Sequence, residues 1–569
     1  MPIDNARGLS VRVALSTAAA MARLARRAGL IGNVKPLAML RFARDSLLHR
    51  SNSGAAILHL HALGDPARPA VVSVPPLGSR EPEQRLSYGE LDARVNLLAH
   101  GLRREGAAPG ERVALYLRNG IENLEVSAAI NHLHAVTVLV GNRLKAPEVA
   151  FILKNSGARV MVFHGEFAKT VEAALAELGP GAPLTRERCF AVGGAPGFAD
   201  YRALLAGGDP AHPPKVTAEE NGGTMIYTSG TTGKPKGARR EIDLKRIETV
   251  IHFMAELPLR HDERHLVVCP LYHSAATAFS LLTWSIGGCL VVLEHFEPLA
   301  VLRAIERERI TSTMMVPTML QRLVDVPGGM ATLRSYDLSS LRCIVSGAAP
   351  LPTELARRVE DAFGPILYNF YGATETGFVT LARPGEHTAR PGTIGRIVGG
   401  NEIRILGEDG KEVDEGAVGE IYVRSRMLME GYHGDESATE KSLREGFVSV
   451  GDLGRRDADG YYYLSDRKSD MVISGGVNIY PLEVEQRLHE HPGIVEVAVV
   501  GVPDPDWGES LVAFVVARAG ATLTVEGLRA FVAETLADFK RPKRVIFVDE
   551  LPRTATGKVL KRELRQRAQ

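Results

Sequence analysis

The sequence predicts an α/β protein: a large N-terminal part of mixed and parallel sheets flanked by helices, with a β-rich subdomain, then a small α+β part. Three regions support this. Residues 85–163 alternate helix-like and strand-like segments, residues 395–430 look like a twisted β-region, and residues 471–569 repeat short strands and helices on a smaller scale. A chain of 569 residues is too long for one hydrophobic core, so several domains are expected.

The first third of the chain carries the βαβ rhythm. Apolar spacing of three and four residues, alternating with β-branched runs, predicts helices and strands in turn at 86–103, 112–117, 122–134, 136–140, 146–155 and 159–163. The interval 180–214 is rich in Gly, Pro and Ala and predicts a loop. Alternation of this kind predicts a mostly parallel sheet.

The stretch TMIYTSGTTGKPKGARR, residues 224–240, is the first candidate for chemistry. A β-run at 224–227 is followed at 228–237 by hydroxyls, glycines and lysines, which suit a polyphosphate because hydroxyls, close backbone amides and cations all bind its oxygens. It is not a P-loop, because Pro235 follows Gly233-Lys234 where Ser or Thr is required. The candidate phosphate-binding residues are Thr228, Ser229, Gly230, Thr231, Thr232, Gly233, Lys234 and Lys236.

Three later strands also end in residues suited to a ligand. His273 follows a strand at 266–269, at a position where α/β crevices form, although a structural histidine fits the spacing equally well. A strand at 343–345 ends in small residues that let a flat ring lie on the backbone: Gly347, Ala348 and Ala349. A strand at 365–369 ends in Tyr371, Gly372, Ala373, Thr374 and Glu375.

That last group offers three distinct functions. Tyr371 can stack on adenine, Thr374 can bond a phosphate, and Glu375 can hold a Mg²⁺ ion that bridges phosphates. Downstream, strands at 401–405 and 419–424 are joined through a Gly-Glu-Asp-Gly turn, and Asp452 stands between glycines. A lone Asp in a turn is usually structural.

Taken in order, these motifs resemble those of the adenylate-forming superfamily, which includes acyl-CoA synthetases, adenylation domains and beetle luciferases. The resemblance runs from about residue 87 to residue 563 and ends in Pro552-Arg-Thr-Ala-Thr-Gly-Lys558. It implies that Lys558, Glu375, Thr228 and His273 are catalytic, that Asp452 grips the ribose hydroxyls, and that Arg467 reaches the nucleotide. It also implies that Gly475 and Gly476 let the pantetheine arm of coenzyme A pass.

The resemblance also implies a domain plan. The expected parts are a basic extension at 1–60, a large AMP- and acyl-binding domain at 61–465, a hinge at 466–470, and a small mobile domain at 471–569. Ser469 occupies the hinge position where relatives commonly carry Asp or Lys, so the contact that stabilises the hinge is left open.

The charge balance and the cysteine content limit which partners and which compartment are expected for this chain. Lys and Arg number 68 against 67 acids, which gives no field for nucleic acid, and four widely spaced cysteines fit reduced, buried thiols in the cytoplasm. Residues 1–50 differ, with nine basic and two acidic side chains. They predict a basic amphipathic helix that lies either on an anionic membrane surface, as a peripheral contact, or on the protein itself.

The resulting functional expectation is an AMP-forming ligase most like a fatty-acyl-CoA synthetase. It would use ATP, Mg²⁺ and coenzyme A on a small-molecule carboxylic acid, as a monomer or homodimer. Small residues at 275–277, without an aromatic gate, favour a medium- to long-chain or bulky apolar acid over acetate. The alternatives are an acyl-AMP ligase that loads a carrier protein, a luciferase-like oxygenase, and a relative that binds nucleotide without catalysis.

Overall fold

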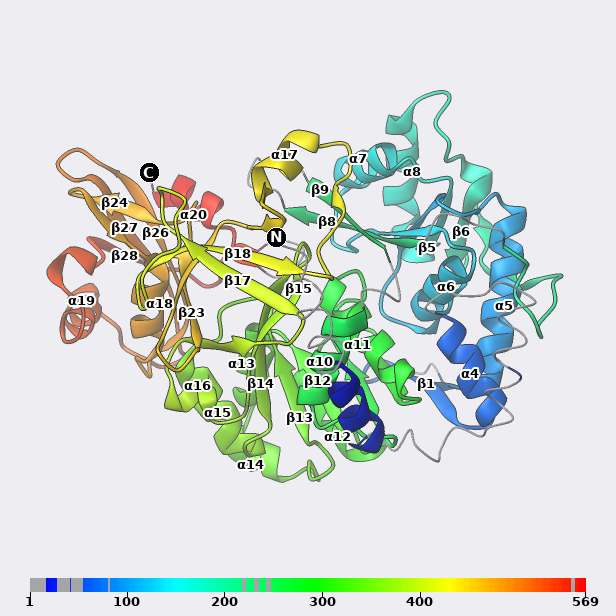
Figure 1. Cartoon of the computed structure of the whole chain (residues 1–569), viewed down its shortest axis with the longest axis horizontal. Helices are drawn as coiled ribbons and strands as arrows, with labels where there is room; N and C mark the ends of the chain where they lie inside the picture. Colours follow the sequence, from blue (N-terminus) through cyan, green and yellow to red (C-terminus); the bar gives the residue numbers. More distant parts are fainter. Residues whose placement is uncertain are drawn as a thin grey trace, which may run out of the picture.

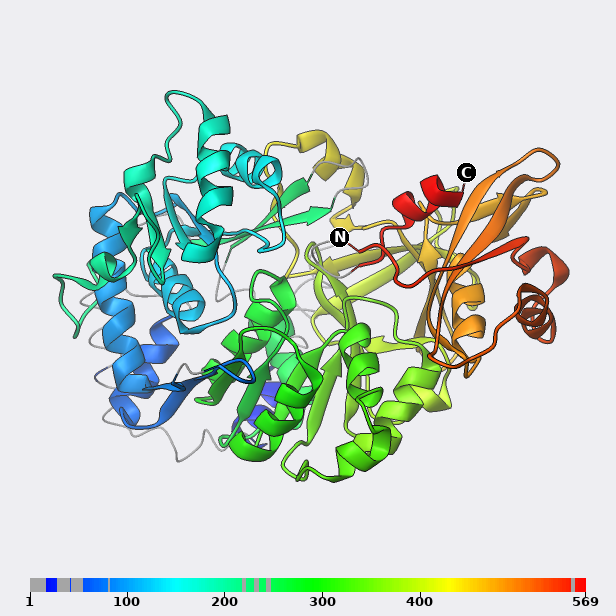
Figure 2. The same cartoon turned by 180° about the vertical axis from the view of Figure 1, so that it is seen from behind.

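The computed structural model describes residues 17–27, 41, 55–79, 82–216, 222–229, 235–241, 247–553 and 558–568. Within these ranges the chain forms three sheets (Figures 1 and 2). The predicted fold class is confirmed: two large sheets with helices on their faces are followed by a β-rich region and a small α+β unit at the C-terminal end.

The largest sheet has fifteen strands. Its parallel part runs in the order β1-β11-β10-β12-β13-β14, and an antiparallel extension continues through β15, β16, β23, β22 and β18. In chain order its strands are β1 Pro69–Val74, β2 Gln84–Ser87, β10 Arg264–Val267, β11 Cys289–Leu293, β12 Ser312–Met315, β13 Cys343–Ser346, β14 Leu367–Ala373, β15 Gly377–Ala382, β16 Thr393–Ile397, β17 Asn401–Leu406, β18 Gly419–Ser425, β20 Leu443–Arg444, β21 Phe447–Val448, β22 Asp452–Arg456 and β23 Tyr462–Arg467.

The second sheet has eight strands in the order β19-β9-β8-β4-β3-β5-β6-β7, and β3 to β8 are parallel. These are β3 Arg112–Tyr116, β4 Val136–Leu139, β5 Val160–His164, β6 Cys189–Val192, β7 Ala199–Asp200, β8 Gly223–Ser229, β9 Pro235–Glu241 and β19 Gly431–Tyr432. The third sheet comprises β24 Val472–Ser474, β25 Val477–Ile479, β26 Ile494–Asp504, β27 Gly508–Ala517 and β28 Arg544–Phe547.

The helices divide among three layers around the two large sheets. One core cluster joins the facing surfaces of both sheets through α4 Ala56–Gly64, α5 Tyr88–Arg104, α6 Ile121–His132, α10 Ile247–Glu256 and α11 Ser274–Ser285. The outer face of the first sheet packs on α12 Pro298–Glu308, α13 Pro317–Val324, α14 Gly329–Arg334 and α15 Thr353–Phe363. The outer face of the second packs on α7 Ala146–Ser156 and α8 Ala168–Leu178.

Strand alternation produces this layering. In β1, Val71 faces the central helices while Val72 faces the outer ones, because successive side chains of a strand point to opposite faces. The remaining helices are α9 Arg202–Leu205, α16 Glu386–Ala389, α17 Glu436–Ser442, α18 Pro481–His489, α19 Val525–Ala533 and α20 Lys561–Ala568. The single-turn helices are η1 Gly165–Phe167, η2 Arg186–Arg188 and η4 Asp538–Lys540.

Several sequence expectations change in the structure. The prediction of a loop over 180–214 is wrong, because β6, β7 and α9 lie there; Cys189–Val192 is a short apolar run buried in the sheet, which the surrounding Gly and Pro concealed. The break predicted over 228–237 is shorter, since residues 228–229 belong to β8 and 235–237 to β9.

The N-terminal helix is confirmed over residues 17–27, where it packs on the protein. Ala20 is buried with Ile251 and Ala255 of α10, and the Arg27 guanidinium donates to the carbonyl oxygens of Ala255 at 3.3 Å and Leu257 at 2.8 Å. These carbonyls are at the C-terminal end of α10, where a cation is favourable. Among the described residues, no helix is both long and apolar enough to cross a bilayer.

Candidate active site

The centre of the candidate site is the buried carboxylate of Asp452, the first residue of β22. Both of its oxygens are paired: the Tyr371 hydroxyl in β14 donates to Oδ2 at 2.9 Å, and Arg467 Nε lies 3.2 Å from Oδ1. Asp452 and Arg467 face each other in the β22–β23 register. Asp452 is only 5% exposed, and these partners offset the cost of removing its carboxylate from water. Burial and the adjacent carboxylate raise the pKa of Tyr371 well above its usual range.

Lys558 faces the same cluster. Its side chain keeps contact with solvent, yet crowding by protein atoms and the positive charge of Arg467 lower its pKa, while Glu375 and Asp452 act in the opposite direction. Burial, together with the charges of Lys558 and Arg143, lowers the pKa of His273 to about 4. His273, at the N-terminus of α11, is therefore neutral at pH 7.

Glu375 follows β14 and is 8% exposed. The Tyr432 hydroxyl donates to its Oε1 at 3.0 Å, and within the described chain no donor reaches its other oxygen. No group of three or more His, Cys, Asp or Glu side chains in that part of the chain could hold a metal alone. Mg²⁺ commonly takes one or two carboxylates and completes its shell with phosphate oxygens and water, and the second oxygen of Glu375 suits such a role. Glu375 is thus a fitting protein ligand.

The small residues Gly347, Ala348 and Ala349 follow β13 directly. Gly347 is buried, and a Cβ atom there would lie 2.4 Å from the Phe370 ring, so only glycine fits. Ala348 adopts a left-handed φ of 67°, and Ala348 and Ala349 are exposed. Gly372 lies within β14 at a register shift against β15. The Thr374 hydroxyl is 3.4 Å from that of Ser274, and Arg240 donates to the Thr374 carbonyl oxygen.

The predicted phosphate-binding loop lies partly outside the described residues. That applies to Gly230, Thr231, Thr232, Gly233 and Lys234, whereas Thr228 and Ser229 end β8 and Lys236 is in β9. Lys236 Nζ is 3.6 Å from Asp435 Oδ2 and 5.1 Å from the centre of the Tyr432 ring, whose hydroxyl reaches Glu375. The β8–β9 hairpin thereby connects to the carboxylate at the end of β14.

Gly475 and Gly476 are placed differently. They form the exposed two-residue turn between β24 and β25, with φ values of 57° and 77° that favour glycine. The Gly475 amide donates to the Trp507 carbonyl oxygen at 2.8 Å. Their described contacts lie within the third sheet, so this structure does not bring them to Asp452 and Lys558.

Residues that come later in the chain make hydrogen bonds to the segment from Asp466 to Asp470. Asp466 accepts the amides of Arg467 at 2.7 Å and Leu482 at 2.9 Å, and burial raises its pKa to about 6. Arg565 of α20 donates to the Ser469 carbonyl oxygen at 3.2 Å and to Asp470 Oδ1 at 2.7 Å. The stabilising contact left open by Ser469 is therefore made by its backbone and its neighbour.

A second ion pair joins the third sheet to the first. Arg518, which follows β27, donates from Nη1 to Asp325 Oδ1 at 2.9 Å, and Arg358 donates to the same carboxylate oxygen at 2.5 Å. Arg518 is already fixed through its Nε, which donates to the Pro492 carbonyl oxygen at 3.0 Å. Each partner thus has a second contact that holds its side chain.

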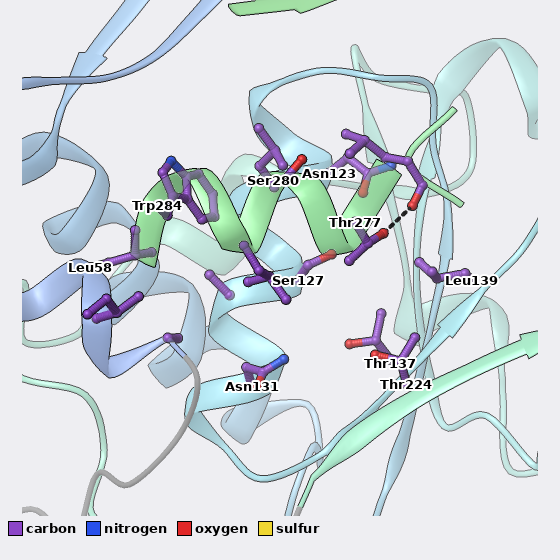
Figure 3. Close-up of a pocket in the computed structure, with 16 residues that line it drawn as sticks. Leu58, Asn123, Ser127, Asn131, Thr137, Leu139, Thr224, Thr277, Ser280 and Trp284 are labelled. Carbon is purple, nitrogen blue, oxygen red and sulfur yellow. Dashed lines mark hydrogen bonds between the residues drawn. The ribbon is translucent and has the colours of Figure 1, made fainter. Parts of the chain in front are cut away.

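A pocket opens beside Leu271 and Thr277, on either side of His273 in sequence (Figure 3). Helices α4, α6 and α11 and strands β4 and β8 line it. The Thr277 hydroxyl donates to the Leu271 carbonyl oxygen at 2.8 Å, which leaves its methyl group on the pocket side of α11 without a bulky aromatic. The pocket lies between the two large sheets, in the layer of central helices.

Sequence reasoning missed Tyr432, Arg240, Asp325 and Arg518. Each acts through a partner more than 50 residues away, and of the four only Arg240 lies in a recognised motif, at its last position. The only local signal was a basic run, Arg239-Arg240, at the end of the candidate phosphate-binding stretch.

Comparison with known proteins places this geometry in context. Residues 58–433 match the family described as AMP-binding enzyme, and residues 483–558 match its C-terminal domain. A feruloyl-CoA synthase of an Amycolatopsis species is 38% identical over 504 residues, covering 88% of this chain and 98% of that protein. A medium/long-chain-fatty-acid–CoA ligase of Mycobacterium tuberculosis is 35% identical, covering 85% of this chain and 86% of the relative.

Among solved structures, the anthranilate CoA ligase AuaEII in complex with anthranoyl-AMP is similar, with a TM-score of 0.80 and 26% identity. The match covers 91% of this chain and 98% of that chain.

The raised pKa of Asp466 gives a testable stability effect. Its carboxyl group binds a proton more tightly in the folded than in the unfolded chain, so this contribution is full below about pH 4 and lost as the pH rises through 6. We expect Asp466→Asn to become more stable relative to wild type across this window, by up to about 3 kcal/mol. Denaturant unfolding at pH 4.5 and pH 7 measures the difference, and a pH-independent difference would contradict it.

Proposed function

The chain belongs to the AMP-binding enzyme family, and we propose that it activates an apolar carboxylic acid as an acyl-adenylate and transfers the acyl group to coenzyme A. As an AMP-forming acid–CoA ligase it uses ATP, Mg²⁺ and coenzyme A. The observation that carries the residue assignment is the position of Lys558, whose charge acts on Asp452, Glu375, Arg467 and His273 together.

In the first half-reaction a carboxylate oxygen of the acid attacks the α-phosphorus of ATP. A P–O bond forms, the bond to pyrophosphate breaks, and the two reacting groups are both anions. We assign Lys558 to offset that repulsion at the forming bond. Bound Mg²⁺ supplies Lewis-acid stabilisation of phosphate oxygens, and Glu375 would hold it. Neutral His273 orients the acid without adding charge.

The nucleotide is held by the surrounding residues. Tyr371 and the wall of Gly347, Ala348 and Ala349 would flank adenine, and Asp452 would accept hydrogen bonds from the ribose hydroxyls. Thr374, Lys236 and the predicted loop residues at 228–234 would bind phosphates, and Arg467 would reach the nucleotide from β23. Asp452 has lone pairs beyond its two described partners, so this role does not require breaking them.

The second half-reaction needs another arrangement of the small part. The coenzyme A thiolate attacks the acyl carbonyl carbon, and AMP leaves with the bonding electrons. We propose that residues 471–569 rotate about 466–470 relative to the large domain, 61–465, so that Lys558 withdraws and Gly475-Gly476 approaches the pantetheine arm. The exposed position of that glycine turn fits an element that has yet to reach the site.

The acid itself is proposed from the pocket beside Thr277. Its lining is largely apolar and lacks an aromatic gate at Thr277, which favours a medium- to long-chain or bulky apolar acid over acetate. The relatives named for feruloyl and fatty acyl groups represent the two shapes such an acid can take.

We also propose a peripheral membrane contact for the N-terminal part. The helix over 17–27 buries Ala20 and Leu24 but exposes Met21, Arg23 and Arg26, and the extension at 1–50 is strongly basic. An exposed basic face with an apolar side chain suits an anionic lipid surface.

The substrate proposal predicts that pyrophosphate release will be faster with decanoic acid or 3-phenylpropenoic acid than with acetate, because only the larger acids bury apolar surface in the pocket. Coupled pyrophosphate detection over this panel, with and without coenzyme A, measures it. Coenzyme A-dependent AMP release would exclude a strict carrier-protein loader. Equal or better turnover with acetate would contradict the proposal.

Lys558→Ala should separate the two half-reactions. Loss of a charge that acts in the transition state typically costs about 10²–10³ in rate, so pyrophosphate release should fall by at least this factor. AMP release from supplied acyl-adenylate and coenzyme A should be retained. Lys543→Ala, an exposed lysine of the same region, is the control. Equal impairment of both steps would contradict the rotation.

The membrane proposal predicts that Arg23→Gln with Arg26→Gln weakens co-sedimentation with phosphatidylserine-containing vesicles in dilute buffer, since each basic residue near such a surface contributes about 1 kcal/mol. Arg202→Gln with Arg309→Gln removes the same charge elsewhere on the surface and serves as the control. If the wild-type chain does not co-sediment, the proposal is wrong.

A further inference from the structure

The pocket beside Thr277 has two chemically different walls. Its apolar wall comes mainly from α4, α6 and α11, with Leu58, Leu124, Leu281 and Trp284. Its polar wall comes from α6 and the strands β4 and β8, with Ser127, Asn131, Thr137 and Thr224. Figure 3 shows these four polar side chains around one space, opposite α11.

The backbone explains why these four residues share a wall. Ser127 and Asn131 are four residues apart in α6 and therefore lie on one face of the helix. Thr137 and Thr224 are register partners in the parallel pair β4–β8, so their side chains point to the same side of the sheet. The helix pair and the strand pair therefore face the same space from two elements.

The hydrogen-bonding capacity of this wall is unused. Thr137 is 3% exposed, and its hydroxyl is buried with no hydrogen-bond partner among the described residues. The side chains of Ser127, Asn131 and Thr224 also form no hydrogen bond within that part of the chain. On α11, by contrast, Thr277 and Ser280 donate to the carbonyl oxygens of Leu271 and Ala276.

A buried hydroxyl without a partner is unfavourable, and folded proteins rarely keep one without a function. Valine has nearly the same shape as threonine and would suit a strand equally well at position 137. The polar wall is therefore costly for folding alone, and its cost is offset when a bound molecule brings a hydrogen-bonding group.

We propose that the acid activated by this enzyme carries a hydroxyl or another hydrogen-bonding oxygen or nitrogen on its apolar body, and that this group pairs with Thr137 inside the pocket. Asn131, Ser127 and Thr224 surround the same group, while Leu281 and Trp284 pack on the apolar body. The inference rests on the proposed function, because it takes this pocket as the acyl site, and it narrows the substrate from an apolar acid to a substituted one.

Bound water is the competing occupant. The wall offers the two to four polar partners that a buried water needs, and water would satisfy Thr137 without any role in selecting the acid. The two cases differ in one measurable respect. A wall that recognises the substrate discriminates between acids that differ only by a hydroxyl group, whereas a wall that holds water does not.

The test uses two matched pairs of acids: 3-phenylpropenoic acid with its 4-hydroxy derivative, and decanoic acid with 10-hydroxydecanoic acid. We expect the wild-type enzyme to prefer the hydroxylated member of at least one pair by about tenfold in kcat/KM for pyrophosphate release, the effect of one well-formed hydrogen bond. Thr137→Val should reduce kcat/KM for that member about tenfold and abolish the preference.

Thr313→Val is the matched control. Thr313 is also a buried strand threonine, but its hydroxyl donates to the Leu266 carbonyl oxygen at 3.0 Å, away from the pocket. This variant should keep the wild-type preference even if it lowers stability. Loss of preference in both variants would show a general effect of a lost hydroxyl and would overturn the assignment to Thr137.

A binding measurement separates this inference from the proposed function. The chain has two tryptophans, and Trp284 lines the pocket, so in a Trp507→Phe background its fluorescence reports occupancy directly. Tighter binding of 10-hydroxydecanoic than decanoic acid, lost in Thr137→Val, supports the inference even if no acid releases pyrophosphate. Equal binding and equal turnover for both pairs, unchanged by Thr137→Val, would overturn it and leave the ligase function intact.

Discussion

The buried carboxylate of Asp452 is the point on which the rest of the site depends. A charge removed from water must be paired, and its partners come from different parts of the sheet: Tyr371 from β14 and Arg467 from β23. Because β22 and β23 are in register at Asp452 and Arg467, the same pairing fixes where the large sheet ends and the connecting segment begins. The proposed nucleotide-binding face and the start of the proposed hinge are therefore one structural unit.

The balance of charges around Asp452 follows from this arrangement. Two carboxylates, Asp452 and Glu375, stand against two cations, Arg467 and Lys558, so this cluster is nearly neutral before a nucleotide enters. A polyphosphate brings several negative charges into a partly desolvated space, where they act more strongly than in water. Without nucleotide the pKa of Lys558 is lowered, and added negative charge next to it favours the protonated, positively charged lysine proposed for the first half-reaction.

The sequence alone predicted most of the fold but fewer of the contacts in the candidate site. Periodicity predicted the alternating elements, and the candidate site residues Gly347, Tyr371 and Glu375 could be found because they lie at or just beyond the ends of strands. Tyr432 and Arg518 could not, since each acts through a partner that only the folded chain brings near. The polar pocket wall could not be predicted for another reason. Thr137 lies in a strand of mostly β-branched residues, where threonine cannot be told from other core residues.

The bridge between Asp325 and Arg518 has a consequence for how the two parts of the molecule respond to their surroundings. The pair joins the third sheet to the outer helices of the first, and both side chains are partly open to solvent. Mobile ions screen such a pair effectively, with a Debye length of about 8 Å at physiological ionic strength. Rising ionic strength therefore weakens this contact between the third sheet and the outer helices of the first, so the strength of the bridge depends on the electrolyte around the protein.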